Sequence, residues 1–189
     1  AGGGLDTYTM VLLHCDGSDA GTTFTNSATA ASHVVTAVAN AQLDTGITPV
    51  FGTACGLFDG TGDYLTMPDH ADWYFTDATD NTTAVDFTID MRVQFASVAA
   101  SAGFYSQRAD DDNQIGFYWA QSTNTLYFEH RTGGTTTISA SASWTPTTAT
   151  WYHIAISRVG SKFYLFVDGI LLSTTTDTSI MANIAGLAR

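Results

Sequence analysis

Residues 86–95, with the sequence DFTIDMRVQF, place apolar and polar side chains in strict alternation. Successive side chains of a β-strand point to opposite faces, so this pattern predicts a strand with one buried and one solvated face. No segment of the chain holds a helical apolar stripe for more than about a turn and a half. The chain is therefore expected to fold through β-strands.

Other strand-length apolar segments support this expectation. They cover residues 9–16, 33–38, 55–58, 115–119, 125–130, 151–159 and 162–167. Gly160-Ser161 and Asp168-Gly169 are predicted to form tight hairpin turns after the last two of these segments. Turn signals recur at roughly 8–12 residue spacing, which is typical of a two-sheet sandwich. We predict a flexible lead-in over residues 1–8 and one antiparallel domain over residues 9–189.

Composition agrees and restricts the partners. About one residue in six is threonine, which favours strands, whereas Glu129 is the only glutamate and Lys162 the only lysine. The chain has six basic and eighteen acidic residues, which gives a net charge of −12. Such a surface repels phosphate backbones and anionic lipids, so we expect no nucleic-acid partner. The longest apolar runs are too short for a membrane-spanning helix, so we expect no membrane insertion.

Three segments in this order carry a resemblance. LLHCDG (12–17), GLFDGTGDYLTMPDHADWYF (56–75) and TWYHIAISRVGSKFYLFVDGILL (150–172) together resemble the concanavalin A-like, laminin G-like jelly-roll domains of virus tail and virion proteins and of secreted bacterial proteins. The resemblance implies an all-β jelly-roll sandwich of two curved antiparallel sheets, with about six or seven strands each.

The same resemblance implies a function. It suggests a non-catalytic adhesion module on a virion surface or outside cells, within a tail-fibre, tail-associated or capsid-decorating protein. The expected partners are host-surface glycans or other virion proteins, in a homo-oligomer or larger assembly. One alternative is an architectural subunit that assembles through sheet edges without a ligand. A second alternative is a carbohydrate-binding module of a secreted bacterial hydrolase.

The family usually closes with a strand of the form G-x-I-D-E-x-R beside its first strand. This chain reaches Ala188-Arg189 before such a segment. We expect that the closing strand is missing, that another chain supplies it, or that the first strand keeps an open edge. An open edge favours pairing with another molecule.

The loop Asp110-Asp111-Asp112-Asn113 is the candidate metal site. Calcium binds six to eight hard oxygen ligands, and a carboxylate-rich loop can supply several of them. Laminin G-like domains can also place an aspartate near this hairpin. The sequence thus predicts calcium ligands at Asp110, Asp112 and Asn113, with a solvated turn as the alternative.

Aromatic residues crowd one predicted hairpin. Phe117 and Trp119 fall on one face of the strand over residues 115–119, and Tyr118 falls on the other. Exposed tyrosine rings offer flat apolar area with a polar edge, which suits sugar binding. Tyr105 and Tyr118 are therefore the candidate ligand-binding residues.

Catalysis is not expected. Glycosidases use two carboxyl groups, about 5 Å apart in retaining enzymes, and relatives on this fold generally place two glutamates on one strand. Glu129 alone cannot form that pair. Asp86 and Asp90 share one strand face, but residues four apart on a strand lie about 13 Å from each other.

The two cysteines, Cys15 and Cys55, are an even count in a chain that the resemblance places outside cells. They could form a disulfide. Two buried thiols that act as small apolar residues are the alternative.

Overall fold

The computed structural model of the chain describes residues 6–30, 32–76 and 82–189. They pack into two compact units, one of residues 70–186 and one of residues up to 69 together with 187–189. Residues 1–5 of the predicted lead-in lie outside the described ranges, and a single domain over residues 9–189 stays a prediction. None of the described segments forms a helix that is long and apolar enough to cross a membrane.

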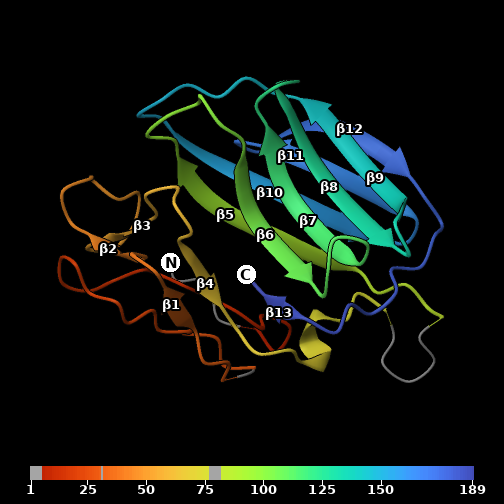
Figure 1. The fold of residues 1–189 in the computed structure, drawn as a ribbon, viewed down its shortest axis with the longest axis horizontal. Helices are drawn as coiled ribbons and strands as arrows, with labels where there is room; N and C mark the ends of the chain where they lie inside the picture. Colours follow the sequence, from red (N-terminus) through yellow and green to blue (C-terminus); the bar gives the residue numbers. More distant parts are fainter. Residues whose placement is uncertain (1–5, 31, 77–81) are drawn as a thin grey trace. The chain divides into compact units, whose positions relative to one another are not determined.

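The larger unit is a sandwich of two antiparallel sheets (Figure 1). One sheet has the order β12-β11-β10-β5, with β5 (Phe87–Gln94), β10 (Trp151–Val159), β11 (Lys162–Val167) and β12 (Ile170–Thr176). The other has the order β6-β7-β8-β9, with β6 (Ala102–Arg108), β7 (Gln114–Ala120), β8 (Thr125–Thr132) and β9 (Thr135–Ser143). A short 3₁₀ helix, η1 (Ala71–Trp73), precedes them. The predicted all-β two-sheet sandwich is confirmed.

Each sheet of this unit has four strands among the described residues of 70–186, whereas the resemblance implies six or seven per sheet for the whole domain. The hairpin turn predicted at Asp168-Gly169 is confirmed, because Val167 pairs with Ile170 across these two residues. Asp168 and Gly169 have φ angles of 50° and 77°, as a two-residue hairpin turn with both central residues left-handed requires.

Alternation along the strands builds the core of the larger unit. Phe117 and Trp119 on β7 are fully buried, and Tyr118 between them faces the opposite way, as predicted. Across the two sheets, the Phe128 ring of β8 stacks on the Phe163 ring of β11, with centroids 5.9 Å apart. The guanidinium of Arg158, itself buried, lies 4.7 Å from the Phe163 ring centroid. Aromatic contacts therefore join the sheets at this point.

The smaller unit is built from short strands. They are β1 (Thr36–Val38), β2 (Gln42–Asp44), β3 (Cys55–Leu57), β4 (Tyr64–Thr66) and β13 (Leu187–Ala188), with β1 paired to β4 and β2 paired to β3. Phe24, Leu43 and Ala54 form its buried centre. This core is small, so side-chain to backbone hydrogen bonds hold much of the unit.

The strand predicted over residues 9–16 is wrong. Within it only Leu13 forms a β-bridge, to Asn26. The Asn26 side chain accepts a hydrogen bond from the Leu12 N–H and donates one to the Met10 carbonyl. An amide side chain thus supplies hydrogen bonds that a partner strand would otherwise supply, which is a local alternative to a ladder.

Cys15 and Cys55 are both free thiols, so the disulfide is not formed in the structure. Cys55 is buried, and its Sγ lies 3.6 Å from the Asp44 carbonyl oxygen. Burial raises the pKa of both thiols. Cys55 thus fits the second alternative, a buried thiol that acts as a small apolar residue, whereas Cys15 is half-buried. The Cys15–Cys55 pairing stays a prediction from the sequence.

We expect Phe163→Ala to lower the free energy of unfolding by about 3–5 kcal/mol, because it removes a fully buried ring between the sheets. Phe166→Ala, on the same strand but half-buried, is the matched control and should cost less than about 2 kcal/mol. Urea unfolding of the two variants measures the difference. Equal losses would mean that the Phe163 ring does not join the sheets.

His130 gives a pH-dependent expectation. Its side chain is fully buried, and burial lowers the pKa of the imidazole from 6.5. As pH falls below about 6.5, the unfolded chain binds a proton that the folded chain does not, so the free energy of unfolding decreases. Urea unfolding between pH 7.5 and 5 should show this decrease in the parent and in His14→Gln, whose histidine is exposed. A decrease of the same size in His130→Gln would contradict the assignment.

Candidate functional site

The outer face of the β6-β7-β8-β9 sheet carries the site. We define it by the side chains that alternate with the core residues of these strands. One cross-strand row joins Ser106, Gly116, Glu129 and Ser139, and the next row joins Gly103, Tyr118, Tyr127 and Ser141. Most of these residues carry hydroxyl, carboxyl or aromatic groups, whereas the opposite face is mostly apolar, with Gln107 and His130 as buried polar residues.

Two tyrosines form a flat platform on this face. Tyr118 of β7 and Tyr127 of β8 are directly paired across the strands. Their ring centroids lie 5.3 Å apart and the ring planes differ by 18°, so the rings are stacked. We call this pair the tyrosine platform.

Glycines leave a hollow beside the platform. At Gly103 a Cβ would have nothing within 4 Å, whereas a Cβ at Gly116, in the next row, would lie 3.5 Å from the Tyr118 ring. The outer-face hollow has a volume of about 380 Å³, and its lining includes Gly103, Gly116, Tyr118, Glu129 and Arg131. Pockets that hold small ligands begin at about 300 Å³.

Glu129 lies at the centre of the site. One carboxylate oxygen accepts a hydrogen bond of 2.6 Å from the Tyr118 hydroxyl, and the other accepts one of 3.0 Å from the Ser139 hydroxyl. Burial raises the pKa of the Tyr118 hydroxyl, and its hydrogen bond to Glu129 raises it further. Tyr118 therefore stays protonated and holds the carboxylate in place as an acceptor.

Arg131 borders the hollow and brings a positive charge. Its Nη2 donates to the Gly134 carbonyl oxygen at 2.8 Å and lies 3.9 Å from an Asp112 carboxylate oxygen. Two contacts thus hold the guanidinium at the end of β8, and the Asp112 charge balances part of its own.

Hydrogen bonds within and next to the acidic loop orient two of the three predicted calcium ligands. Asp110 Oδ1 already accepts from the Asp112 N–H and from the Asn113 side-chain amide, which lowers the pKa of the Asp110 carboxyl. Asn113 Oδ1 accepts from the Gly133 N–H and the Thr132 hydroxyl. These bonds engage one oxygen of the Asp110 carboxylate and the single side-chain oxygen of Asn113, and Asp112 lies near Arg131. Calcium binding at these three residues stays a prediction from the sequence.

Both predicted ligand-binding residues, Tyr105 and Tyr118, border the hollow, but their side chains point in different directions. Tyr118 lies on the outer face, whereas a β-bulge between Gly103 and Tyr105 turns the Tyr105 side chain toward the core. The Tyr105 ring makes an edge contact with Phe75, with centroids 6.2 Å apart. Its hydroxyl is buried and has no hydrogen-bond partner among the described residues, and burial raises its pKa.

Sequence reasoning missed Tyr127 and the role of Glu129. The sequence does contain a signal for the position of Tyr127. A hairpin with its turn at residues 121–124 pairs residues symmetrically about that turn. Pairing Trp119 with Leu126 on the core face also places Tyr118 opposite Tyr127 on the other face.

A model of the concanavalin A-like lectin/glucanases superfamily matches residues 59–186. No curated protein sequence matches the chain.

Among solved structures, domain 4 of an extracellular GH43 arabinanase from Geobacillus stearothermophilus, in complex with arabinotriose, is similar. Its TM-score is 0.58 at 10% identity, with 83% of this chain and 71% of that chain covered. The module CBM66 from Bacillus subtilis gives a TM-score of 0.47 at 15% identity and covers 82% and 86% of the two chains. The CBM40 of a Ruminococcus gnavus sialidase, bound to α2,3-sialyllactose, gives 0.45 at 16% identity, and the alignment spans 53% of this chain and 58% of that module.

We expect Glu129→Gln to lower the pKa of Tyr118 toward the ordinary value of 10, because it removes the negative charge next to the phenol. The pKa should stay above 10, because burial is the larger cause of the shift. Tyrosine ring NMR signals followed over alkaline pH measure the change. Ser139→Ala, which leaves the charge in place, is the control. An unchanged Tyr118 pKa in Glu129→Gln would show that the two groups are not in contact.

Proposed function

Because the chain belongs to the concanavalin A-like lectin/glucanases superfamily, we propose that the outer face of its β6-β7-β8-β9 sheet binds a neutral carbohydrate without catalysis. The tyrosine platform beside the hollow is the observation that carries this proposal. The C–H face of a sugar ring packs well on a flat aromatic surface, which also offers polar groups at its edge.

The polar groups around the platform suit hydroxyl groups. Glu129 accepts two hydrogen bonds in the structure, and its two oxygens retain capacity for more. Ser106 and Gln114, which also line the hollow, add a hydroxyl and an amide that both donate and accept. The net charge of −12 disfavours anionic glycans, and Arg131 is already held by Gly134 and Asp112. A neutral saccharide therefore matches the site best.

The carboxyl groups support the proposal that the site is not catalytic. Among the described residues that line the hollow, Glu129 is the one that carries a carboxylate. Acid–base cleavage of a glycosidic bond requires a second one on the other side of the bond. We therefore propose a binding domain and no glycosidase activity.

The finer proposal concerns where the domain works. We propose that it acts outside cells as an adhesion module of a virion surface protein, in a tail-fibre, tail-associated or capsid-decorating role, with host glycans as partners. The support for this is the resemblance of the three sequence segments. A carbohydrate-binding module of a secreted bacterial hydrolase fits the family equally well. Sequencing the rest of the reading frame separates the two, because the second requires a neighbouring catalytic domain.

A specific observation favours an architectural role as a further candidate. β12 is an edge strand of its sheet, and its residues Ile170, Leu171 and Leu172 are exposed. An exposed apolar edge strand is suited to pairing with another chain. Mass photometry distinguishes the roles: ordered oligomers without any glycan binding would favour the architectural one.

We expect Tyr118→Ala and Tyr127→Ala each to weaken glycan binding by about tenfold or more, because each removes half of the stacked platform. The measurement is a glycan-array screen, followed by calorimetry with the neutral sugar that gives the strongest signal. Tyr164→Ala is the matched control, because Tyr164 stacks with Phe166 on β11 of the other sheet. Equal weakening in the control, or unchanged affinity in both platform variants, would contradict the proposal.

A further inference from the structure

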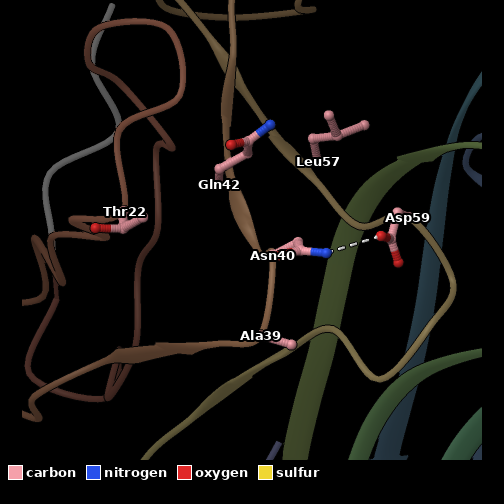
Figure 2. Close-up of a pocket in the computed structure, with 6 residues that line it drawn as sticks. All are labelled: Thr22, Ala39, Asn40, Gln42, Leu57 and Asp59. Atoms are coloured by element: carbon pink, nitrogen blue, oxygen red, sulfur yellow. Dashed lines mark hydrogen bonds between the residues drawn. The ribbon is translucent and has the colours of Figure 1, made fainter.

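The smaller unit has a pocket of its own. It has a volume of about 480 Å³ and is lined by Thr22, Ala39, Asn40, Gln42, Leu57 and Asp59 (Figure 2). Three stretches of chain supply these residues: the loop before β1, the β1–β2 turn with β2, and β3 with the turn that follows it. We call it the N-terminal pocket. All of its lining lies within the unit, so it is a site separate from the outer face of the larger unit.

The Asp63 carboxylate holds two turns of the pocket together. Asp63 accepts from the Asn40 backbone N–H and from the Asp59 backbone N–H, each at 2.7 Å. These two bonds join the β1–β2 turn to the turn after β3. The backbone positions of Asn40 and Asp59 are thus set before any ligand arrives, which reduces the ordering cost of binding.

The side chains of the two turns are also oriented. The Asn40 amide donates to Asp59 Oδ2 at 3.2 Å, as the dashed line in Figure 2 shows. Asp59 Oδ1 accepts from the Thr61 N–H at 2.7 Å. These hydrogen bonds lower the pKa of the Asp59 carboxyl, so this group is an acceptor throughout the neutral range.

Several polar atoms of the pocket keep their capacity for a ligand. No described hydrogen bond engages the side-chain amide of Gln42, the side-chain oxygen of Asn40 or the hydroxyl of Thr22. Together they offer donors and acceptors in one place. Gln42 pairs across the strands with Leu57, which adds an apolar surface next to the amide.

The polar groups of the N-terminal pocket indicate which class of ligand it binds. A sugar hydroxyl both donates and accepts, so it matches amides and a carboxylate placed side by side. An anion would meet Asp59 and Asp63 in a chain of net charge −12. Calcium binds six to eight oxygen ligands, whereas Asp59 is the one carboxylate among the residues that line the pocket. The pocket is open, because four of its lining residues are exposed: Thr22, Ala39, Asn40 and Asp59. It therefore suits a hydrophilic ligand that stays partly in water.

We propose that the N-terminal pocket is a second binding site for a neutral, polyhydroxylated ligand of saccharide type, with Gln42, Asn40 and Asp59 as its hydrogen-bonding residues. This site does not depend on the tyrosine platform. Each of the two can be lost without the other.

Amide NMR titrations of the whole chain test this proposal. The probes are arabinotriose, maltotriose and cellotriose, each raised to about 10 mM so that millimolar affinity is detected. We expect at least one of them to shift the amide signals of Asn40, Gln42 and Leu57 in a saturable way. Gln42→Ala should weaken that response at least fivefold, whereas Gln121→Ala, in the exposed turn after β7, should leave it unchanged.

The variant Tyr118→Ala separates this site from the platform. If the Asn40 and Gln42 signals still respond in Tyr118→Ala, the N-terminal pocket binds by itself, whatever happens at the platform. The proposal is overturned if no probe sugar shifts these signals, or if Gln42→Ala leaves the response unchanged. It is equally overturned if calcium chloride alone saturates the pocket while the sugars do not.

Discussion

The antiparallel pairing of β7 with β8 is the constraint on which the candidate site depends. It places Phe117 opposite Phe128 and Tyr118 opposite Tyr127. The first pair is fully buried and the second lies stacked on the outer face. A slip of one residue would send tyrosines into the core and phenylalanines into water. The burial of the two phenylalanines therefore also fixes the register of the site.

The same period of two explains why the site is polar and the interior is not. On each strand the site residue lies between two buried neighbours. This holds for Gly116 on β7, Glu129 on β8 and Ser139 on β9. Glycine at this position removes side-chain bulk, while its neighbours bring hydrogen-bonding groups. The hollow thus lies at two strand positions without side chains, Gly103 beside the bulge of β6 and Gly116 on β7.

Much of the larger unit could be predicted from local patterns, and part of it could not. The segments at β5, β7, β8, β10 and β11 have clear alternation or tight turns, and they were predicted. β9 was not, because TTTISASAS mixes small and hydroxyl residues whose burial depends on the partner strand. Tyr105 faces the core because a β-bulge shifts the register of β6, and no local pattern indicates that bulge. The strand expected at residues 9–16 failed because the Asn26 side chain, outside that segment, takes part of its backbone hydrogen bonding.

By itself, the sequence determined the all-β class, the hairpin turns and which side chains of a strand share a face. Those properties depend on the two-residue period and on φ preferences, which are local. Only the tertiary structure decided which tyrosines stack, that Glu129 stands between Tyr118 and Ser139, and that Asn40 and Asp59 meet across one pocket. These contacts join residues of different strands and turns, and their geometry depends on register and on packing between segments distant in the chain.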